Sequence, residues 1–309
     1  MASRLPVPDF HPLPLIDPYR DRTTYRRFLS ELYHAERAAM EGFALLSNPD
    51  YVQESDIFIG ASRKLVADER AHLADLEEMI ALLDDGGGGV LPADPISEQF
   101  WSFWNSGEVF ALPMRPAVAA MLILFAEGLG YAVLYNLTRA TLDPKMRALL
   151  ESNVKDEQGH LRVSMTVLRR ALTREPDFAL DFAVHGLGFA LCARHPARSQ
   201  RPVFEGVGMD FNALFACGLA FVRDLFAIVL RDLGREAEAR RLEGTIGNFL
   251  CSARGMKLLY PLTFLPDPPL AKRLILGYGK LDQWLSARRK KQVAPHPPPP
   301  EARPTRMAS

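Results

Sequence analysis

The sequence carries one acidic pattern twice, as Asp68-Glu69-Arg70-Ala71-His72 and as Asp156-Glu157-Gln158-Gly159-His160. In an α-helix, residues three positions apart lie on the same face, so each pattern presents a carboxylate and an imidazole together. Leucine and other apolar residues recur at helical spacing around both patterns, which places the Glu and the His on the apolar face. The two patterns therefore predict two helices that turn these groups toward a common core.

Two further glutamates extend the arrangement to four helices. Glu36 lies on the apolar face of a helix expected at 24–46, and Glu127 is the only acidic residue between Ala117 and Asp143. The order is Glu, Glu-x-x-His, Glu, Glu-x-x-His, and four carboxylates with two imidazoles form the ligand set of a two-metal site in a four-helix bundle. We predict that six residues bind the metal ions and carry the catalytic chemistry: Glu36, Glu69, His72, Glu127, Glu157 and His160.

The aspartates before the two glutamates fit a supporting role. A metal-bound imidazole usually donates its other N–H to a carboxylate, which fixes the orientation of the ring. We expect Asp68 to serve His160 and Asp156 to serve His72, each from the opposite helix. The alternative is that both aspartates are exposed helix positions.

Chance and ion pairing are the alternatives to a metal site. A third pair, Glu31-x-x-His34, has the same spacing, but it lies far from Glu36 around the helix and is expected to be a solvated surface pair. Buried carboxylates need a compensating charge, and arginine or lysine can supply it. The segment from Ala117 to Thr138 contains no basic residue, however, which favours a metal ion near Glu127.

Composition limits the class of protein. In 309 residues, 48% are hydrophobic, and 37 Lys and Arg balance 37 Asp and Glu, so no overall charge favours nucleic acid or anionic lipid. Three cysteines without metal-ligand spacing fit a reducing compartment. The first twenty residues lack the apolar core of a signal peptide, and Glu127 at the centre of the most apolar stretch argues against a membrane span. We expect a cytoplasmic protein.

The chain is predicted to be all-α, because no long alternating apolar pattern indicates a sheet. Five prolines in the first twenty residues predict an extended arm over 1–23, and the proline-rich, basic residues 288–309 predict a disordered tail. Between them we expect one helical domain, 24–287, with a metal-binding core over 24–173 and accessory helices over 178–287. The expected helices cover 24–46, 54–83, 117–141, 145–173, 178–194, 209–233, 236–258 and 268–288.

The arrangement of residues 24–173 resembles the ferritin-like di-iron carboxylate superfamily. It is most similar to the oxygen-activating branch that includes p-aminobenzoate N-oxygenase, the multicomponent monooxygenases and the small subunit of ribonucleotide reductase. The paired Asp-Glu-x-x-His motifs and the gap of 58 residues between Glu69 and Glu127 carry this resemblance. It implies a ferritin-like four-helix bundle, here with additional C-terminal helices.

Two departures separate the chain from particular members of that branch. Asn153 stands where the N-oxygenases carry a further histidine ligand, one turn before the last Glu-x-x-His. Ala71 and Gly159 stand where the multicomponent monooxygenases tend to carry arginine before the motif histidine. The resemblance therefore extends to the superfamily and not to a particular enzyme.

The resemblance implies two iron ions, or one manganese and one iron, that react with O2. It implies that Glu69 or Glu157 caps one ion and that Glu36 or Glu127 bridges the pair, without fixing which. We expect a monooxygenase or oxidase acting on a small organic substrate, with electrons from an external reductase or ferredoxin. A carrier protein and a second copy of the chain are further candidate partners.

Two other functions stay open. A tRNA-modifying hydroxylase of the same superfamily would use Arg194, Arg198 and Arg201, with Arg288 to Lys291 of the tail, as a basic patch. The neutral overall charge makes nucleic acid the weaker partner. A ferroxidase or a non-catalytic iron-binding protein is the other class. It would not need the accessory helices or an organic pocket.

Overall fold

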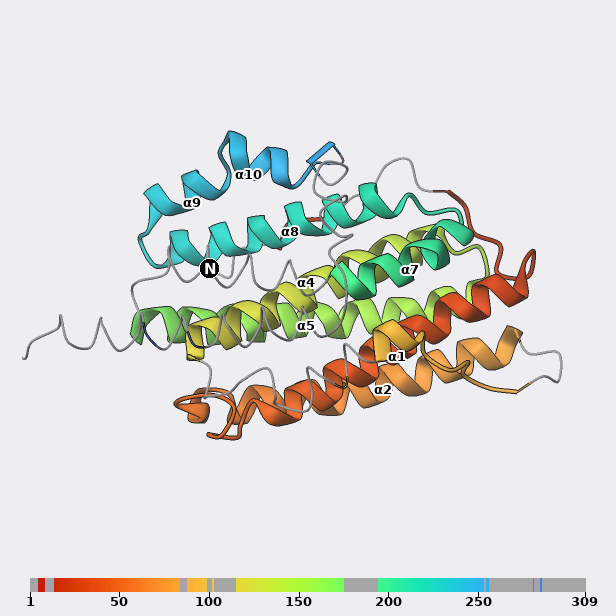
Figure 1. The fold of residues 1–309 in the computed structure, drawn as a ribbon, viewed down its shortest axis with the longest axis horizontal. Coiled ribbons are helices and arrows are strands. Elements are labelled where there is room, and N and C mark those ends of the chain that lie inside the picture. Colours follow the sequence, from red (N-terminus) through yellow and green to blue (C-terminus); the bar gives the residue numbers. More distant parts are fainter. Residues whose placement is uncertain are drawn as a thin grey trace, which may run out of the picture.

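The computed structural model describes residues 5–8, 14–83, 88–98, 102, 115–174, 194–252, 254–255, 280 and 284. Helices dominate this part of the chain (Figure 1), and the only β-type pairing in it is an isolated bridge between Ile16 and Thr141. The predicted all-α class is therefore confirmed.

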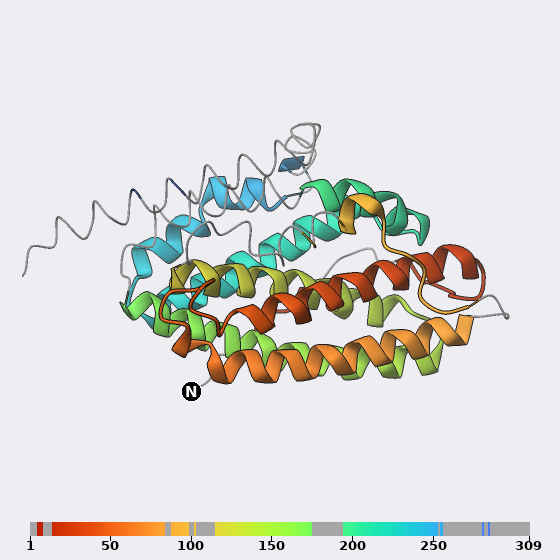
Figure 2. The same ribbon diagram turned by 60° about the horizontal axis from the view of Figure 1, so that its bottom comes forward.

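Four long helices form the centre of the molecule: α1 (Arg22–Leu45), α2 (Ile59–Leu83), α4 (Pro116–Ala140) and α5 (Pro144–Arg174). They lie side by side in both views (Figures 1 and 2), with α1 packed on α2, α4 packed on α5, and α2 in contact with α5. Each falls within two residues of an expected helix, except that α2 is preceded by a separate 3-10 turn, η1 (Ser55–Ile57).

Side-chain caps explain where two of these helices begin. The Asp21 carboxylate accepts the backbone N–H of Thr24 at 3.1 Å, and the Asp143 carboxylate accepts that of Met146 at 2.7 Å. Each bond satisfies a backbone donor that has no partner within the helix. Pro144, which lacks an N–H, occupies the first position of α5, where none is needed. The helix expected at 145–173 thus begins one residue earlier, at Pro144.

Four further helices cover this centre. They are α7 (Arg194–Gly206), α8 (Phe211–Asp232), α9 (Glu236–Leu242) and α10 (Thr245–Leu250). Helix α8 packs on α4 and α5, α7 packs on α1, and α9 and α10 pack on α8.

The accessory helices agree only in part with the prediction. The segment 209–233 is helical as expected, whereas 236–258 is divided into two short helices at Glu243 and Gly244. Helix α7 was not predicted, because it contains Pro202 and proline removes a helical hydrogen bond. The expected helices at 178–194 and 268–288 and the tail 288–309 lie almost entirely outside the described residues.

The described parts of the N-terminal arm run along α4. The Ile16 N–H donates to the Ala140 carbonyl at 2.9 Å, and the Ile16 carbonyl accepts the N–H of Leu142 at 2.9 Å. Further along, the Asn136 side chain donates to the Pro8 carbonyl at 2.8 Å. The arm is therefore held to α4 by its backbone.

The buried apolar side chains form two clusters rather than one. Along α2, Leu65 belongs to the first cluster and Leu76 to the second, with Glu69 and His72 between them. On α1 and α5 the two clusters follow in the reverse order along the chain, and the predicted ligands again lie between them. A polar layer thus crosses the interior of the molecule.

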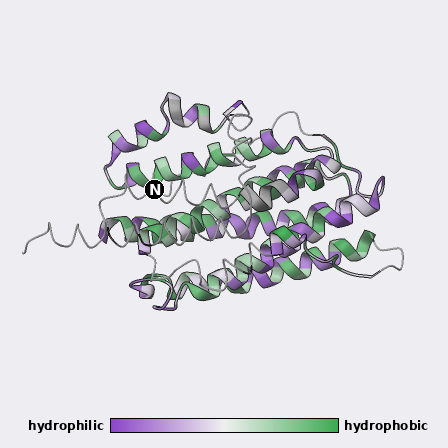
Figure 3. Cartoon of the chain, in the orientation of Figure 1, coloured by the Kyte–Doolittle hydropathy of each residue, from purple (hydrophilic) through white to green (hydrophobic). Residues whose placement is uncertain are grey.

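Two helices, α4 and α8, are long and apolar enough to cross a membrane by length and composition alone (Figure 3). More than half of the most apolar window of each is buried against other parts of the chain. Core helices of folded proteins pass the same test, and α4 carries a carboxylate, Glu127, halfway along its length.

The contact between α4 and α8 provides a test of the fold. A Cβ added at Gly128 would lie 2.6 Å from a methyl carbon of Val222, whereas one added at Gly130 would have no neighbour within 4 Å. Relative to Gly130→Ala, Gly128→Ala should therefore lower the free energy of unfolding by about 1–3 kcal/mol, because the Val222 side chain or α8 itself must move. Gly130→Ala, the matched control, should raise it by roughly 0.5–1 kcal/mol through helix propensity. Urea unfolding of the metal-free protein measures both changes, and equal effects would contradict the packing.

Candidate metal centre

The structure brings together all six predicted ligands at the polar layer. Glu36 comes from α1, Glu127 from α4, and each of the other two helices supplies one Glu-x-x-His pair. Their ligand atoms form two groups, in each of which all atoms lie within 4.8 Å of one another. The first group is Glu36, Glu69, His72 and Glu157, and the second group is Glu69, Glu127, Glu157 and His160.

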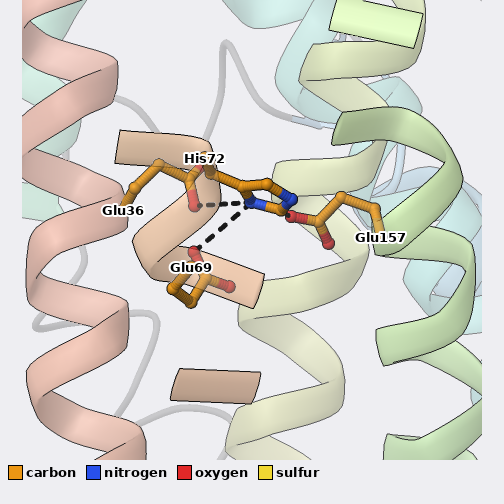
Figure 4. A group of neighbouring side chains, drawn as sticks. All are labelled: Glu36, Glu69, His72 and Glu157. Carbon is orange, nitrogen blue, oxygen red and sulfur yellow. Dashed lines mark ion pairs between the residues drawn. The ribbon is translucent and has the colours of Figure 1, made fainter. Parts of the chain in front are cut away.

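The first group surrounds His72, and Figure 4 shows its four side chains converging from α1, α2 and α5. The Nδ1 atom of His72 lies 3.7 Å from a Glu36 oxygen, 3.6 Å from a Glu69 oxygen and 3.7 Å from a Glu157 oxygen. These separations leave the nitrogen and the oxygens facing one space without direct hydrogen bonds.

The second group surrounds His160 in the same way. Its Nδ1 atom lies 2.8 Å from Glu127, 3.5 Å from Glu69 and 3.6 Å from Glu157. In both histidines Nδ1 faces the carboxylates, so the two rings present the same atom to the centre.

Glu69 and Glu157 belong to both groups, whereas Glu36 and Glu127 each belong to one. A carboxylate shared by two ligand groups is placed to bridge two ions, and an unshared one is placed to cap a single ion. This sharing favours Glu69 and Glu157 as bridging residues, whereas the resemblance implied Glu36 or Glu127. The sharing arises because the two Glu-x-x-His helices, α2 and α5, contact each other.

The outer nitrogens of the two histidines point to the aspartates of the opposite motif. His160 Nε2 lies 3.0 Å from the Asp68 carboxylate and donates to it. His72 Nε2 lies 4.0 Å from the Asp156 carboxylate, which is too far for a hydrogen bond. Each histidine therefore faces the aspartate of the opposite motif, but only the pair of His160 and Asp68 forms a hydrogen bond.

Burial makes this group of charges costly without a cation. Glu69, Glu127 and Glu157 are buried, with Glu69 only 1% exposed, and Glu36 is mostly covered. Within the described residues, their ion pairs are with His72 and His160, and none is with a lysine or an arginine. Ionised carboxylates in such surroundings require a compensating positive charge.

The proton affinities of the site reflect this crowding. Burial and the charge of Glu127 raise the pKa of Glu157 to about 8. Burial and the charge of Glu36 raise the pKa of Glu69 well above its usual range. Burial alone would lower the pKa of His160, but its contacts with Glu127 and Glu157 outweigh that effect and raise it to about 11. Protons supply the missing positive charge in the metal-free protein.

The donor atoms fit a bound metal. Among the described residues, Glu69 Oε2, Glu157 Oε2 and both ring nitrogens of His72 are buried and have no hydrogen-bond partner. Native proteins rarely leave such atoms unpaired, and several in one place indicate an absent ligand or ion. These buried Glu and His groups can hold metal ions.

The prediction for Glu31 and His34 was wrong. The pair is buried, with 2% and 7% exposure, because residues 88–98, called the strap below, cross over α1 at this point. His34 Nε2 donates to the Leu91 carbonyl at 2.8 Å, and Glu31 Oε1 accepts the N–H of Asp94 at 3.3 Å. Neither residue belongs to the metal-binding groups.

Two residues beside the metal-binding groups, Lys64 and Asn153, were not predicted to belong to the site. Lys64 forms an ion pair with Asp68, four residues later on α2. Asn153, one turn before Glu157, is buried, and its Oδ1 has no partner in the described part of the chain. The i,i+4 spacing of Lys64 and Asp68 was the available signal for the first. Asn153 was noted only as a departure from a family pattern.

The raised pKa values predict how pH affects stability. Unfolded Glu157 and His160 release their protons near 4.5 and 6.5, but in the folded metal-free protein they hold them up to about 8 and 11. Between these values the folded state binds more protons, so unfolding becomes easier as pH rises from about 5 to 9. The lowered pKa of Glu36 has the opposite effect, but only below 4.5.

Urea unfolding of the metal-free protein at pH 6 and pH 9 measures this slope. Glu157→Gln, which removes one titrating group, should make the slope shallower. Metal replaces the same protons, so metal affinity should rise with pH and the loaded protein should keep its stability at pH 9. A metal-free protein that is more stable at pH 9 than at pH 6 would contradict this account of the charges.

Comparisons with known proteins identify no family or relative for this chain. A scan against protein-family models, a search of curated proteins and a search of solved structures each found no match.

Proposed function

We propose that the protein is an oxygen-dependent di-iron oxidoreductase, a monooxygenase or oxidase built on a ferritin-like four-helix bundle. The observation that carries the proposal is the pair of ligand groups that share Glu69 and Glu157. Two ions held by shared carboxylates lie close enough to act on one small molecule together, which a pair of separate sites does not allow. The packing of α1 on α2, of α4 on α5 and of α2 on α5 supports such a bundle.

The donor set favours iron. Four carboxylates and two imidazoles suit iron or manganese, while the absence of thiolates from both groups makes an iron–sulfur cluster a poor fit. When bound, the metal pair supplies electrons to O2 and so makes it reactive toward an organic substrate. The same donor set also allows a mixed pair, with manganese in one position and iron in the other.

The protein's own residues then have separate tasks. Glu69 and Glu157, which belong to both ligand groups, would help to hold both ions, while Glu36 and Glu127 would each help to hold one. His72 and His160 would bind through Nδ1, and His160 is oriented by the hydrogen bond from Nε2 to Asp68 at 3.0 Å. The two apolar clusters on either side of the centre exclude water from it.

Helix α8 supports an enzyme rather than an iron store. It packs on α4 and α5, the helices that carry Glu127 and the second Glu-x-x-His pair. A helix in that position adds a wall beside the metal centre, where a small organic substrate needs an enclosing surface. We therefore propose a small-molecule substrate and an external electron donor, such as a reductase or ferredoxin, as the partners.

The basic residues of α7 give little support to a tRNA substrate. Arg201 forms an ion pair with Glu205 at 2.6 Å, one turn along the same helix. Such a pair neutralises part of the basic patch that nucleic acid would require. A ferroxidase remains the main competitor, and the reaction with O2 separates it from an oxygenase.

Metal content tests the ligand assignment. Glu127→Gln keeps the size of the side chain but removes its charge, so the variant should bind one iron where the parent binds two. Glu31→Gln is the matched control, because it changes a buried helical glutamate outside the ligand groups and should keep both ions. Metal quantification after anaerobic equilibrium dialysis against Fe(II) gives the answer, with circular dichroism as the check on folding. Two ions in Glu127→Gln would contradict the assignment of Glu127.

The reaction with oxygen tests the activity. The protein loaded anaerobically with Fe(II) should, when mixed rapidly with O2, show a transient visible absorption band that Glu69→Gln abolishes. Oxidation of two irons without such a band would favour a ferroxidase. A protein that binds neither iron nor manganese would contradict the enzyme proposal as a whole.

A further inference from the structure

The two halves of the centre differ in how their histidines are held. On one side, Asp68 accepts the Nε2–H of His160 at 3.0 Å, and this carboxylate is 23% exposed. On the other side, Asp156 lies 4.0 Å from His72 Nε2 and is 44% exposed. The sequence motifs are the same, so the difference arises from their surroundings.

Lys64 is one source of the difference. Its ammonium group pairs with the same Asp68 oxygen that accepts from His160, and this oxygen is thereby fixed from two sides. Lys64 also reaches across to α5, where its Nζ atom lies 3.9 Å from the position of a Cβ at Gly159, the neighbour of His160. Within the described residues, Asp156 forms no ion pair with a lysine or an arginine.

The contacts of the Nδ1 atoms, which face the ligand groups, also differ between the two histidines. His160 Nδ1 lies 2.8 Å from Glu127, whereas the nearest carboxylate oxygen to His72 Nδ1 is 3.6 Å away. Both nitrogens of His72 lack a hydrogen-bond partner in the described part of the chain. The ring of His160 is therefore held in orientation at both nitrogens, whereas the ring of His72 is held at neither within the described residues.

We propose that the two metal positions are unequal: the position at His160 binds the first ion tightly, and the position at His72 binds the second ion weakly and exchanges it with solution. Lys64 is a positioning residue for the tight site, acting through Asp68. This inference rests on the proposed two-metal centre and adds an order of loading to it. It also identifies the His72 position as the one where a different metal can replace iron.

The physical reason is pre-organisation. A histidine that is already oriented loses little freedom on binding a metal, and a carboxylate on its outer nitrogen makes the inner nitrogen a stronger donor. Removal of such an outer contact typically lowers metal affinity by about 10- to 100-fold. A position that lacks the contact should be weaker by a similar factor.

Two single-site variants isolate the two positions. Glu36→Gln removes a ligand that belongs only to the first group, and Glu127→Gln removes one that belongs only to the second. In anaerobic Co(II) titrations followed by visible absorption, each variant should bind one ion. We expect Glu36→Gln, which keeps the His160 position, to bind Co(II) about 10- to 100-fold more tightly than Glu127→Gln. Equal dissociation constants would overturn the proposal.

The contribution of the outer residues is measured in the Glu36→Gln background. Asp68→Asn should weaken Co(II) binding by about 10- to 100-fold, and Lys64→Met should weaken it in the same direction by a smaller factor. Lys64→Arg should restore it and with it the Co(II) spectrum, which a merely structural role would not do. Lys145→Met is the matched control, because it breaks an ion pair to Glu78 between the same two helices without contacting the centre.

Asp156→Asn in the Glu127→Gln background completes the set. It should change Co(II) affinity less than threefold or so, well below the effect expected of an intact outer contact. A loss as large as that caused by Asp68→Asn would overturn the inequality while leaving two bound ions and the proposed function intact. Failure of the parent protein to bind Co(II), Fe(II) or Mn(II) would instead remove the metal centre itself.

Discussion

The burial of four carboxylates between helices, without a basic side chain to neutralise them in the described structure, is the constraint on which the rest of the molecule depends. Charges of one sign in a poorly hydrated space repel one another and lose their hydration. The raised pKa values of Glu69 and Glu157 express that strain in the absence of a metal. Bound cations neutralise the carboxylates and so relieve this repulsion. The arrangement that destabilises the metal-free fold therefore favours metal binding.

The rest of the interior is organised around this polar layer. One apolar cluster lies on each side of it, and the long helices pass through both clusters, which fixes the ligands in place. Close contact between α4 and α8 at Gly128, next to Glu127, brings an accessory helix up to the centre. The stability of the fold and the position of the ligands therefore depend on the same helix contacts.

Much of the candidate site could be predicted from helical periodicity. Glu36, Glu69, His72, Glu127, Glu157 and His160 all lie where the apolar faces place them, because a helix face is a local property of the sequence. The sharing of Glu69 and Glu157 could not be predicted, since it depends on which helices touch. The burial of Glu31 and His34 depends on the strap, which is distant in sequence, and α7 formed despite an internal proline.

Apart from the ion pair between Arg37 and Glu98 at 2.7 Å, the polar contacts of the strap with α1 are made by its own backbone. Side chains of α1 bind the peptide groups of Gly89, Leu91, Pro92 and Asp94, so the identities of those strap residues matter little to the contact. The helix, in contrast, must keep its Arg26, Arg27, Ser30, Glu31 and His34. In related chains, the residues of the strap should therefore vary more than these five residues of α1. A search for distant relatives should use the five α1 residues as its pattern.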